Sequence, residues 1–111
     1  MKVAVIGSRT FSNQNQMFSV LDKLKITHLV SGGARGADSL AEQWAHQKKI
    51  PVTVYKPDWE RFGKSAGFLR NYDIIQDAEL VVAFWDGTSK GTEHSIKYAK
   101  RINKPIIIEK F

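Results

Sequence analysis

The sequence predicts an α/β fold of the Rossmann-like type: a three-layer sandwich in which helices cover both faces of a five-stranded parallel sheet. Five short apolar segments alternate with four stretches of helical periodicity along the 111 residues. This alternation favours a parallel sheet with right-handed crossovers. We expect the strand order 3-2-1-4-5. Because a chain of this length has room for one core, residues 1–111 are predicted to form a single domain.

The first half of the chain is predicted to supply three strands and two helices. Residues 2–6 form a continuous apolar run, which is typical of a strand buried on both faces. Further strands are expected at residues 27–31 and 52–55. Ser12 or Asn13 caps the first helix. Apolar residues with helical spacing indicate the two helices. In the first helix they are Met17, Val20, Leu21 and Leu24, and in the second they are Ala37, Leu40, Ala41, Trp44 and Ala45.

The second half begins with residues 56–66, which have neither helical nor strand periodicity and are expected to form a long irregular loop. Strands are expected at residues 80–84 and 106–108, and Asn103 is expected to end the last helix. The buried faces predicted for the two helices are Phe68, Leu69, Tyr72 and Ile75, then Ile96, Ala99 and Ile102.

Composition excludes several classes of protein. The chain has no cysteine, which rules out disulfides and thiolate metal sites. Its N-terminal apolar run is too short for a signal peptide or a membrane span, so we expect a cytoplasmic protein with no membrane partner. The three histidines have neither metal-site spacing nor a triad arrangement. We therefore expect no metal and no cofactor, and the oligomeric state stays open, with a homo-oligomer among the alternatives.

Residues 31–38 are the most informative stretch, because an apolar strand runs there through three glycines into a helix. Glycine permits positive φ and close approach, so backbone N–H groups can converge on an anion beside the positive end of the helix dipole. The alternative is a tight turn without a ligand. The stretch matches neither the dinucleotide fingerprint nor the P-loop.

In the expected strand order, the winding reverses between the first and fourth strands, and ligands bind beyond the carboxyl ends of strands at such a point. Several polar loops should meet there. The candidate ligand-binding and phosphate-binding residues are Gly7, Ser8, Arg9, Ser31, Gly32, Gly33, Arg35, Asp38, Arg70, Asn71, Asp86, Gly87, Ser89, Gly91 and Thr92.

These candidates have different expected roles. The glycines and Thr92 would bind phosphate through backbone N–H groups and a hydroxyl, and the arginines through forked contacts. Asp86, at the end of a strand, would accept hydrogen bonds from ribose hydroxyls or a base. Asp38 has a structural alternative as a carboxylate at a helix start. Trp59 or Trp85 could stack on a base or simply pack under a loop.

The motifs at residues 5–9, 31–38, 57–59, 63–67, 70–71 and 91–92 together resemble the SLOG superfamily, a Rossmann-like group that includes DprA and the LOG phosphoribohydrolases. The chain is most similar to its small YspA/YpsA-related branch. The resemblance implies binding of a nucleotide or nucleotide derivative, either a nucleoside monophosphate or an ADP-ribose-like signal, by a sensor or ligand-binding module. Members occur near phage and bacterial conflict systems, which makes a phage origin one interpretation.

The sequence also departs from this family. LOG enzymes carry a PGGxGTxxE motif, and the position of its glutamate is Ser95 here, although Arg70 matches their arginine. Hydrolysis of a glycosidic bond depends on a placed carboxylate. Phosphoribohydrolase or N-glycosidase activity on nucleoside monophosphates therefore needs a substitute, with Glu93 and Asp86 as catalytic candidates, and we favour binding alone. Single-stranded DNA binding, by likeness to DprA, is a further alternative that the scattered basic residues do not favour.

Overall fold

The structure contains the predicted five-stranded parallel sheet. The computed structural model describes residues 1–111, which is the whole chain. The strands lie in the order β3-β2-β1-β4-β5, and every neighbouring pair is parallel, as predicted. Their bounds are Lys2–Gly7 for β1, His28–Ser31 for β2, Val52–Val54 for β3, Leu80–Trp85 for β4 and Ile106–Lys110 for β5.

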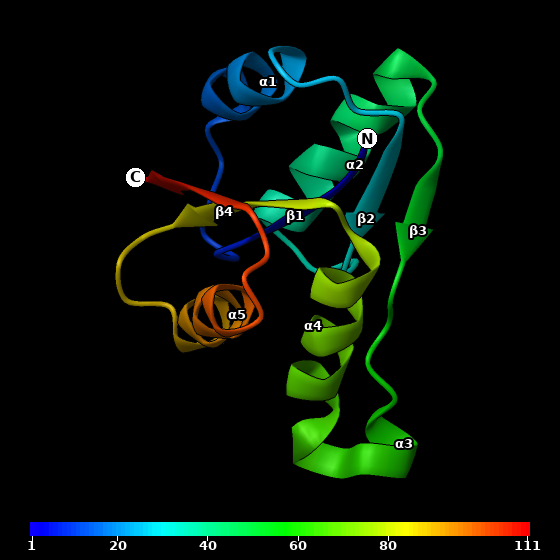
Figure 1. Cartoon of the computed structure of the whole chain (residues 1–111), viewed down its shortest axis with the longest axis vertical. Helices are drawn as coiled ribbons and strands as arrows, with labels where there is room; N and C mark the ends of the chain where they lie inside the picture. Colours follow the sequence, from blue (N-terminus) through cyan, green and yellow to red (C-terminus); the bar gives the residue numbers. More distant parts are fainter.

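Helices cover both faces of this sheet and make three layers (Figure 1). Because side chains alternate along a strand, the continuous apolar run of β1 supplies both cores. The helices are α1 (Gln14–Asp22), α2 (Ala37–Lys48), α3 (Trp59–Phe62), α4 (Ala66–Asp77) and α5 (Lys90–Arg101), with a 3₁₀ turn at Gly63–Ser65. Val3 and Val5 pack with α1 and α2, whereas Ala4 and Ile6 pack with α4 and α5.

Several helix ends follow the sequence signals. The Asn13 side chain caps α1 by accepting a hydrogen bond from the Gln16 N–H at 3.0 Å. Asn103 lies just after α5 with φ 58°, a left-handed conformation that stops a helix. Trp44 is buried in the core, and its indole N–H donates to Asp22 at 2.9 Å.

The prediction of an irregular loop at residues 56–66 is wrong. Asp58 accepts a hydrogen bond from the Arg61 N–H at 3.1 Å and caps the single turn of α3. The 3₁₀ turn follows and leads directly into α4. A helix of four residues is too short to produce a periodic pattern, which is why the sequence does not indicate it.

Two predicted buried faces are also partly wrong. Phe68 and Leu69 are exposed, because the first turn of α4 projects with α3 beyond the sheet, at the bottom of Figure 1. The buried positions of this helix are Ala66, Ile74 and Ile75. Ile102 is exposed as well, since α5 ends one residue before it.

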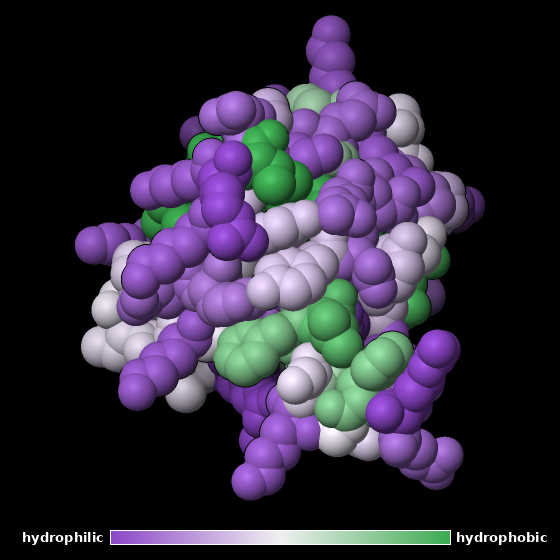
Figure 2. Space-filling model, turned by 60° about the horizontal axis from the view of Figure 1, so that its bottom comes forward, coloured by the Kyte–Doolittle hydropathy of each residue, from purple (hydrophilic) through white to green (hydrophobic).

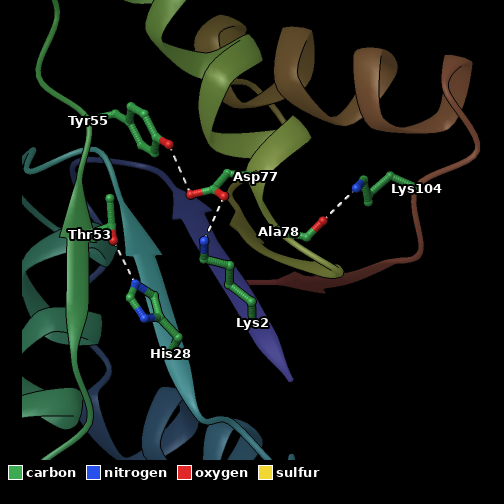
Figure 3. Close-up of polar contacts among 7 residues, drawn as sticks. All are labelled: Lys2, His28, Thr53, Tyr55, Asp77, Ala78 and Lys104. Atoms are coloured by element: carbon green, nitrogen blue, oxygen red, sulfur yellow. Dashed lines mark hydrogen bonds and ion pairs between the residues drawn. The ribbon is translucent and has the colours of Figure 1, made fainter.

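A polar network joins the C-terminal end of α4 to the sheet, away from the predicted site (Figure 3). Lys2 forms an ion pair with Asp77 at 2.7 Å, and the Tyr55 hydroxyl donates to the other carboxylate oxygen at 2.9 Å. The hydrogen bond from Lys2, followed by that from Tyr55, lowers the pKa of Asp77. His28 and Thr53 share a hydrogen bond at 2.6 Å between β2 and β3. These groups are engaged with one another, which indicates a structural role.

The fold predicts that two glycine substitutions reduce the stability of the protein by very different amounts. Gly36 has φ +74°, and a Cβ there would lie 2.5 Å from the carbonyl oxygens of Ser8 and Arg9. Gly87 has φ +88° but open space around it. Gly36→Ala should therefore lower the free energy of unfolding by about 3 kcal/mol or more, because steric overlap adds to backbone strain, and Gly87→Ala by about 1 kcal/mol. Urea denaturation of both variants measures the difference, and equal losses would contradict the packing described here.

Candidate functional site

A cavity of about 330 Å³, here called the first cavity, lies beyond the carboxyl ends of β1 and β4, where the winding of the sheet reverses. Its lining comes from the end of β1 and the loop after it, from the loop after β2 with the start of α2, from the second and third turns of α4, and from the start of α5 with the residue before it. The lining residues are Ile6, Gly7, Ser8, Arg9, Thr10, Ala34, Asp38, Arg70, Asn71, Ile74, Ser89, Gly91, Thr92 and Ser95.

The glycine turn after β2 directs its amides to groups of the protein itself. The Ala34 N–H donates to the Asp38 carboxylate at 3.1 Å, and the Gly33 N–H donates to the Ser31 hydroxyl at 3.3 Å. Asp38 is 7% exposed. Burial raises its pKa from 3.8 to about 6, although the Ala34 and Gly32 amides and the charge of Arg70 act in the opposite direction. The anion held by this turn is therefore the side chain of Asp38.

Arg70 is the half-buried cation of the first cavity. Its Nη1 donates a hydrogen bond to the carbonyl oxygen of Gly32 at 2.7 Å, and its Nε donates to the Asn71 side chain at 2.9 Å. Burial, and secondarily the charge of Arg9, lower the pKa of Arg70, whereas Asp38 raises it. Nη2 donates to no group of the protein, so two of the five N–H donors of the guanidinium are available to a ligand.

Hydrogen bonds tie the loop after β1 to the start of α5. The N–H of Ser8 donates to the Phe84 carbonyl oxygen at 3.0 Å, and its hydroxyl lies 2.8 Å from that of Ser89. The Ser89 hydroxyl donates in turn to Asp86 at 2.9 Å. Hydrogen bonds from the Ser89 and Thr88 amides lower the pKa of Asp86 to about 2. Asp86 thus shapes its own loop.

The first turn of α5 presents Gly91 and Thr92 to the first cavity. Backbone N–H groups of a first turn have no partner within the helix, and the helix dipole makes this end positive. Arg9 and Arg70 add two cations, against Asp38 as the one carboxylate in the lining. The arrangement therefore suits an anionic group.

The structure brings together in the first cavity the predicted residues of the β1 loop, Asp38, the Arg70–Asn71 pair, and Ser89, Gly91 and Thr92. Other predicted residues lie outside its lining: Ser31, Gly32, Gly33, Arg35, Asp86, Gly87 and Glu93. The Gly33 N–H, which the sequence predicts to bind phosphate, donates to the Ser31 hydroxyl in this structure. Asp86 likewise faces the amides of its own loop rather than the first cavity.

Five lining residues are absent from the predicted set: Ile6, Thr10, Ala34, Ile74 and Ser95. Helical spacing could have identified two of them. Ser95 follows Thr92 by three positions, and Ile74 follows Arg70 by four, so each pair shares a helix face.

Two further observations concern other kinds of site. None of the helices has the length and apolar character that a transmembrane segment requires. The structure contains no group of three or more metal-ligating side chains placed to hold an ion.

Comparisons of sequence find relatives of this chain. A family model described as the YspA, cpYpsA-related SLOG family matches residues 1–62. The gene 61 protein of Mycobacterium phage D29 is 36% identical over 117 residues, which cover 96% of this chain and 94% of that protein. Translation initiation factor IF-2 of Ligilactobacillus salivarius is 35% identical over 92 residues, covering 81% of this chain but 12% of that factor.

Comparisons of structure find the same fold in DNA processing protein A, DprA. The Streptococcus pneumoniae protein has a TM-score of 0.81 at 20% identity and matches 96% of this chain. The Helicobacter pylori protein, which binds single-stranded DNA, has a TM-score of 0.75 at 22% identity and matches 97%. This chain spans 49% and 64% of those two DprA chains, respectively, and at these identities the likeness establishes the Rossmann-like fold alone.

The buried carboxyl group of Asp38 predicts a pH dependence of stability. Its pKa is higher in the folded than in the unfolded state, so its contribution to stability is complete below pH 4 and is lost as the pH rises through about 6. Asp38→Asn does not titrate. The free energy of unfolding of this variant, relative to that of the original protein, should therefore increase by up to roughly 3 kcal/mol between pH 4 and pH 7.

Urea denaturation at several pH values measures this difference, and a carboxyl NMR titration identifies the group directly. A constant difference between the two proteins, or an Asp38 titration near pH 4, would contradict the burial described for this side chain.

Proposed function

The chain belongs to the YspA, cpYpsA-related SLOG family, and from this premise we propose that it is a binding module for a nucleotide-type ligand, whose phosphate binds in the first cavity. The observation that carries the proposal is that the first turn of α5 and the guanidinium of Arg70, whose Nη2 donates to no group of the protein, line the same cavity. Backbone amides at a helix start, combined with a guanidinium, are a recurrent phosphate-binding arrangement.

Electrostatics support a bound anion. The charge of Arg9 lowers the pKa of Arg70, which means that the two cations repel each other across the first cavity. A phosphate between them would remove this repulsion. The Asp38 carboxylate, which lines the same cavity, accepts a hydrogen bond from the Ala34 amide and interacts with the charge of Arg70, so the protein itself compensates part of its negative charge.

Size favours one nucleotide in the first cavity. Ligand cavities in proteins range from about 300 to 1,000 Å³, and this one, at about 330 Å³, is at the lower end. The first cavity by itself therefore has room for a nucleoside monophosphate rather than for a whole ADP-ribose-like molecule, the other ligand class that the family resemblance implies.

Binding is favoured over hydrolysis by the positions of the carboxylates. Glu93 lies outside the first cavity and forms an ion pair with Lys97 at 2.9 Å. Asp86 is held by amides of its own loop, and Ser95 lines the first cavity where LOG enzymes have glutamate. Incubation with adenosine monophosphate (AMP) should therefore release no adenine. If the protein releases adenine and the Asp38→Asn variant does not, the protein is a hydrolase instead.

The phosphate group of a nucleotide should contribute most of its binding free energy. Calorimetric titration is expected to give binding of AMP at least tenfold tighter than that of adenosine, because adenosine lacks the group that the α5 amides and Arg70 would bind. Inorganic phosphate should compete with AMP. Equal affinity for AMP and adenosine would overturn the proposal.

Arg70→Lys retains a positive charge but removes the forked donor geometry, so AMP binding should weaken by roughly 10- to 100-fold. Arg61→Lys is the matched control, because Arg61 is exposed on α3 and does not line the first cavity. Calorimetry of both variants, with thermal denaturation to verify folding, tests the role. Equal AMP affinities in the two variants would contradict it.

A further inference from the structure

A second cavity lies on the adjoining side of α5. It is lined by Phe68, Gly87, Thr88, Lys90, Glu93, His94 and Lys97, none of which lines the first cavity. Both cavities use the segment from the end of β4 to the first turn of α5: Ser89 and Gly91 face one, and Thr88 and Lys90 face the other. A helix with its side chains is roughly 10 Å wide, so a single nucleotide in the first cavity cannot also fill the second.

Phe68 gives the second cavity an aromatic surface. Its ring lies 4.5 Å from that of His94, which is 5.4 Å from Tyr72, and Tyr72 is 4.5 Å from Tyr98. Phe68 is the outermost ring of this series and is 44% exposed. Figure 2 shows apolar surface gathered among hydrophilic side chains on the face turned forward, which is the end where α3 lies. An exposed ring held by other rings is a suitable stacking surface for a planar base.

The polar groups of the second cavity are suited to a phosphate. Lys97 is paired with Glu93, whereas Lys90 forms no ion pair and stands in the first turn of α5. Nε2 of His94 lies 3.2 Å from the Tyr72 hydroxyl, which holds the imidazole against the neighbouring ring. Lys90 is therefore the cationic group of the second cavity that a phosphate would contact.

We propose that the second cavity is a subsite for the distal half of a dinucleotide bridged by pyrophosphate. This inference rests on the proposed function: the first phosphate lies in the first cavity, the second phosphate contacts Lys90, and the second base stacks on Phe68. The natural ligand is then a dinucleotide rather than a mononucleotide, and the first cavity holds its proximal half.

The experiment compares three probes by calorimetry: AMP, adenosine diphosphate (ADP) and diadenosine pyrophosphate. ADP should bind several-fold tighter than AMP, and Lys90→Ala should remove that gain. Diadenosine pyrophosphate should bind about tenfold tighter than ADP, and Phe68→Ala should remove that gain without changing AMP affinity. The matched controls are Lys100→Ala, at the other end of α5, and Phe62→Ala, an exposed ring outside the second cavity.

The outcomes separate the two proposals. Absence of AMP binding overturns the proposed function. AMP binding with no gain for diadenosine pyrophosphate overturns the second subsite alone. An equal loss of affinity for AMP and for diadenosine pyrophosphate in Phe68→Ala also overturns the second subsite, because the ring would then stabilise the fold rather than bind a base. A 5′-phosphorylated oligonucleotide that binds tighter than diadenosine pyrophosphate, with steep salt dependence, would assign a nucleic-acid strand instead.

Discussion

The close approach of Arg70 to Gly32 is the constraint on which the first cavity depends. A Cβ at position 32 would lie 2.8 Å from Nη1 of Arg70 and 2.9 Å from the Asp38 carboxylate, so a side chain there would displace both groups. The carbonyl oxygen of Gly32 accepts the hydrogen bond that fixes the guanidinium. The glycine thus allows a cation from α4 and a carboxylate from α2 to meet at the end of β2. This meeting fixes one wall of the first cavity.

The glycine turn and the start of α5 therefore differ in the anion that each one binds. In the turn, the protein supplies its own anion, the Asp38 carboxylate, which occupies the Ala34 amide. At α5, Gly91 and Thr92 of the first turn line the first cavity, and the first-turn amides have no partner within the helix. Any external anion is therefore expected at α5. The loop after β1 keeps its position because Ser8 bonds to the Phe84 carbonyl oxygen and to Ser89.

The sequence predicts the sheet well, because continuous apolar runs ending in glycine or polar residues indicate parallel strands and their order determines which loops meet. It predicts less well which side of a helix faces the cavity. Thr92 and Glu93 are neighbours in sequence but face different cavities, since successive helical residues are rotated by about 100°. The engagement of Asp86 by its own loop, and the projection of Phe68 beyond the sheet, depend on three-dimensional positions that no local pattern contains.

A crystal structure of the protein with AMP tests most directly whether the loops at the switch point form a phosphate site. The phosphate is expected within hydrogen-bond distance of the Gly91 and Thr92 amides and of Nη2 of Arg70, with Asp38 still bonded to the Ala34 amide. A phosphate bound elsewhere on the molecule, or a first cavity without AMP at saturating concentration, would contradict this interpretation of the fold.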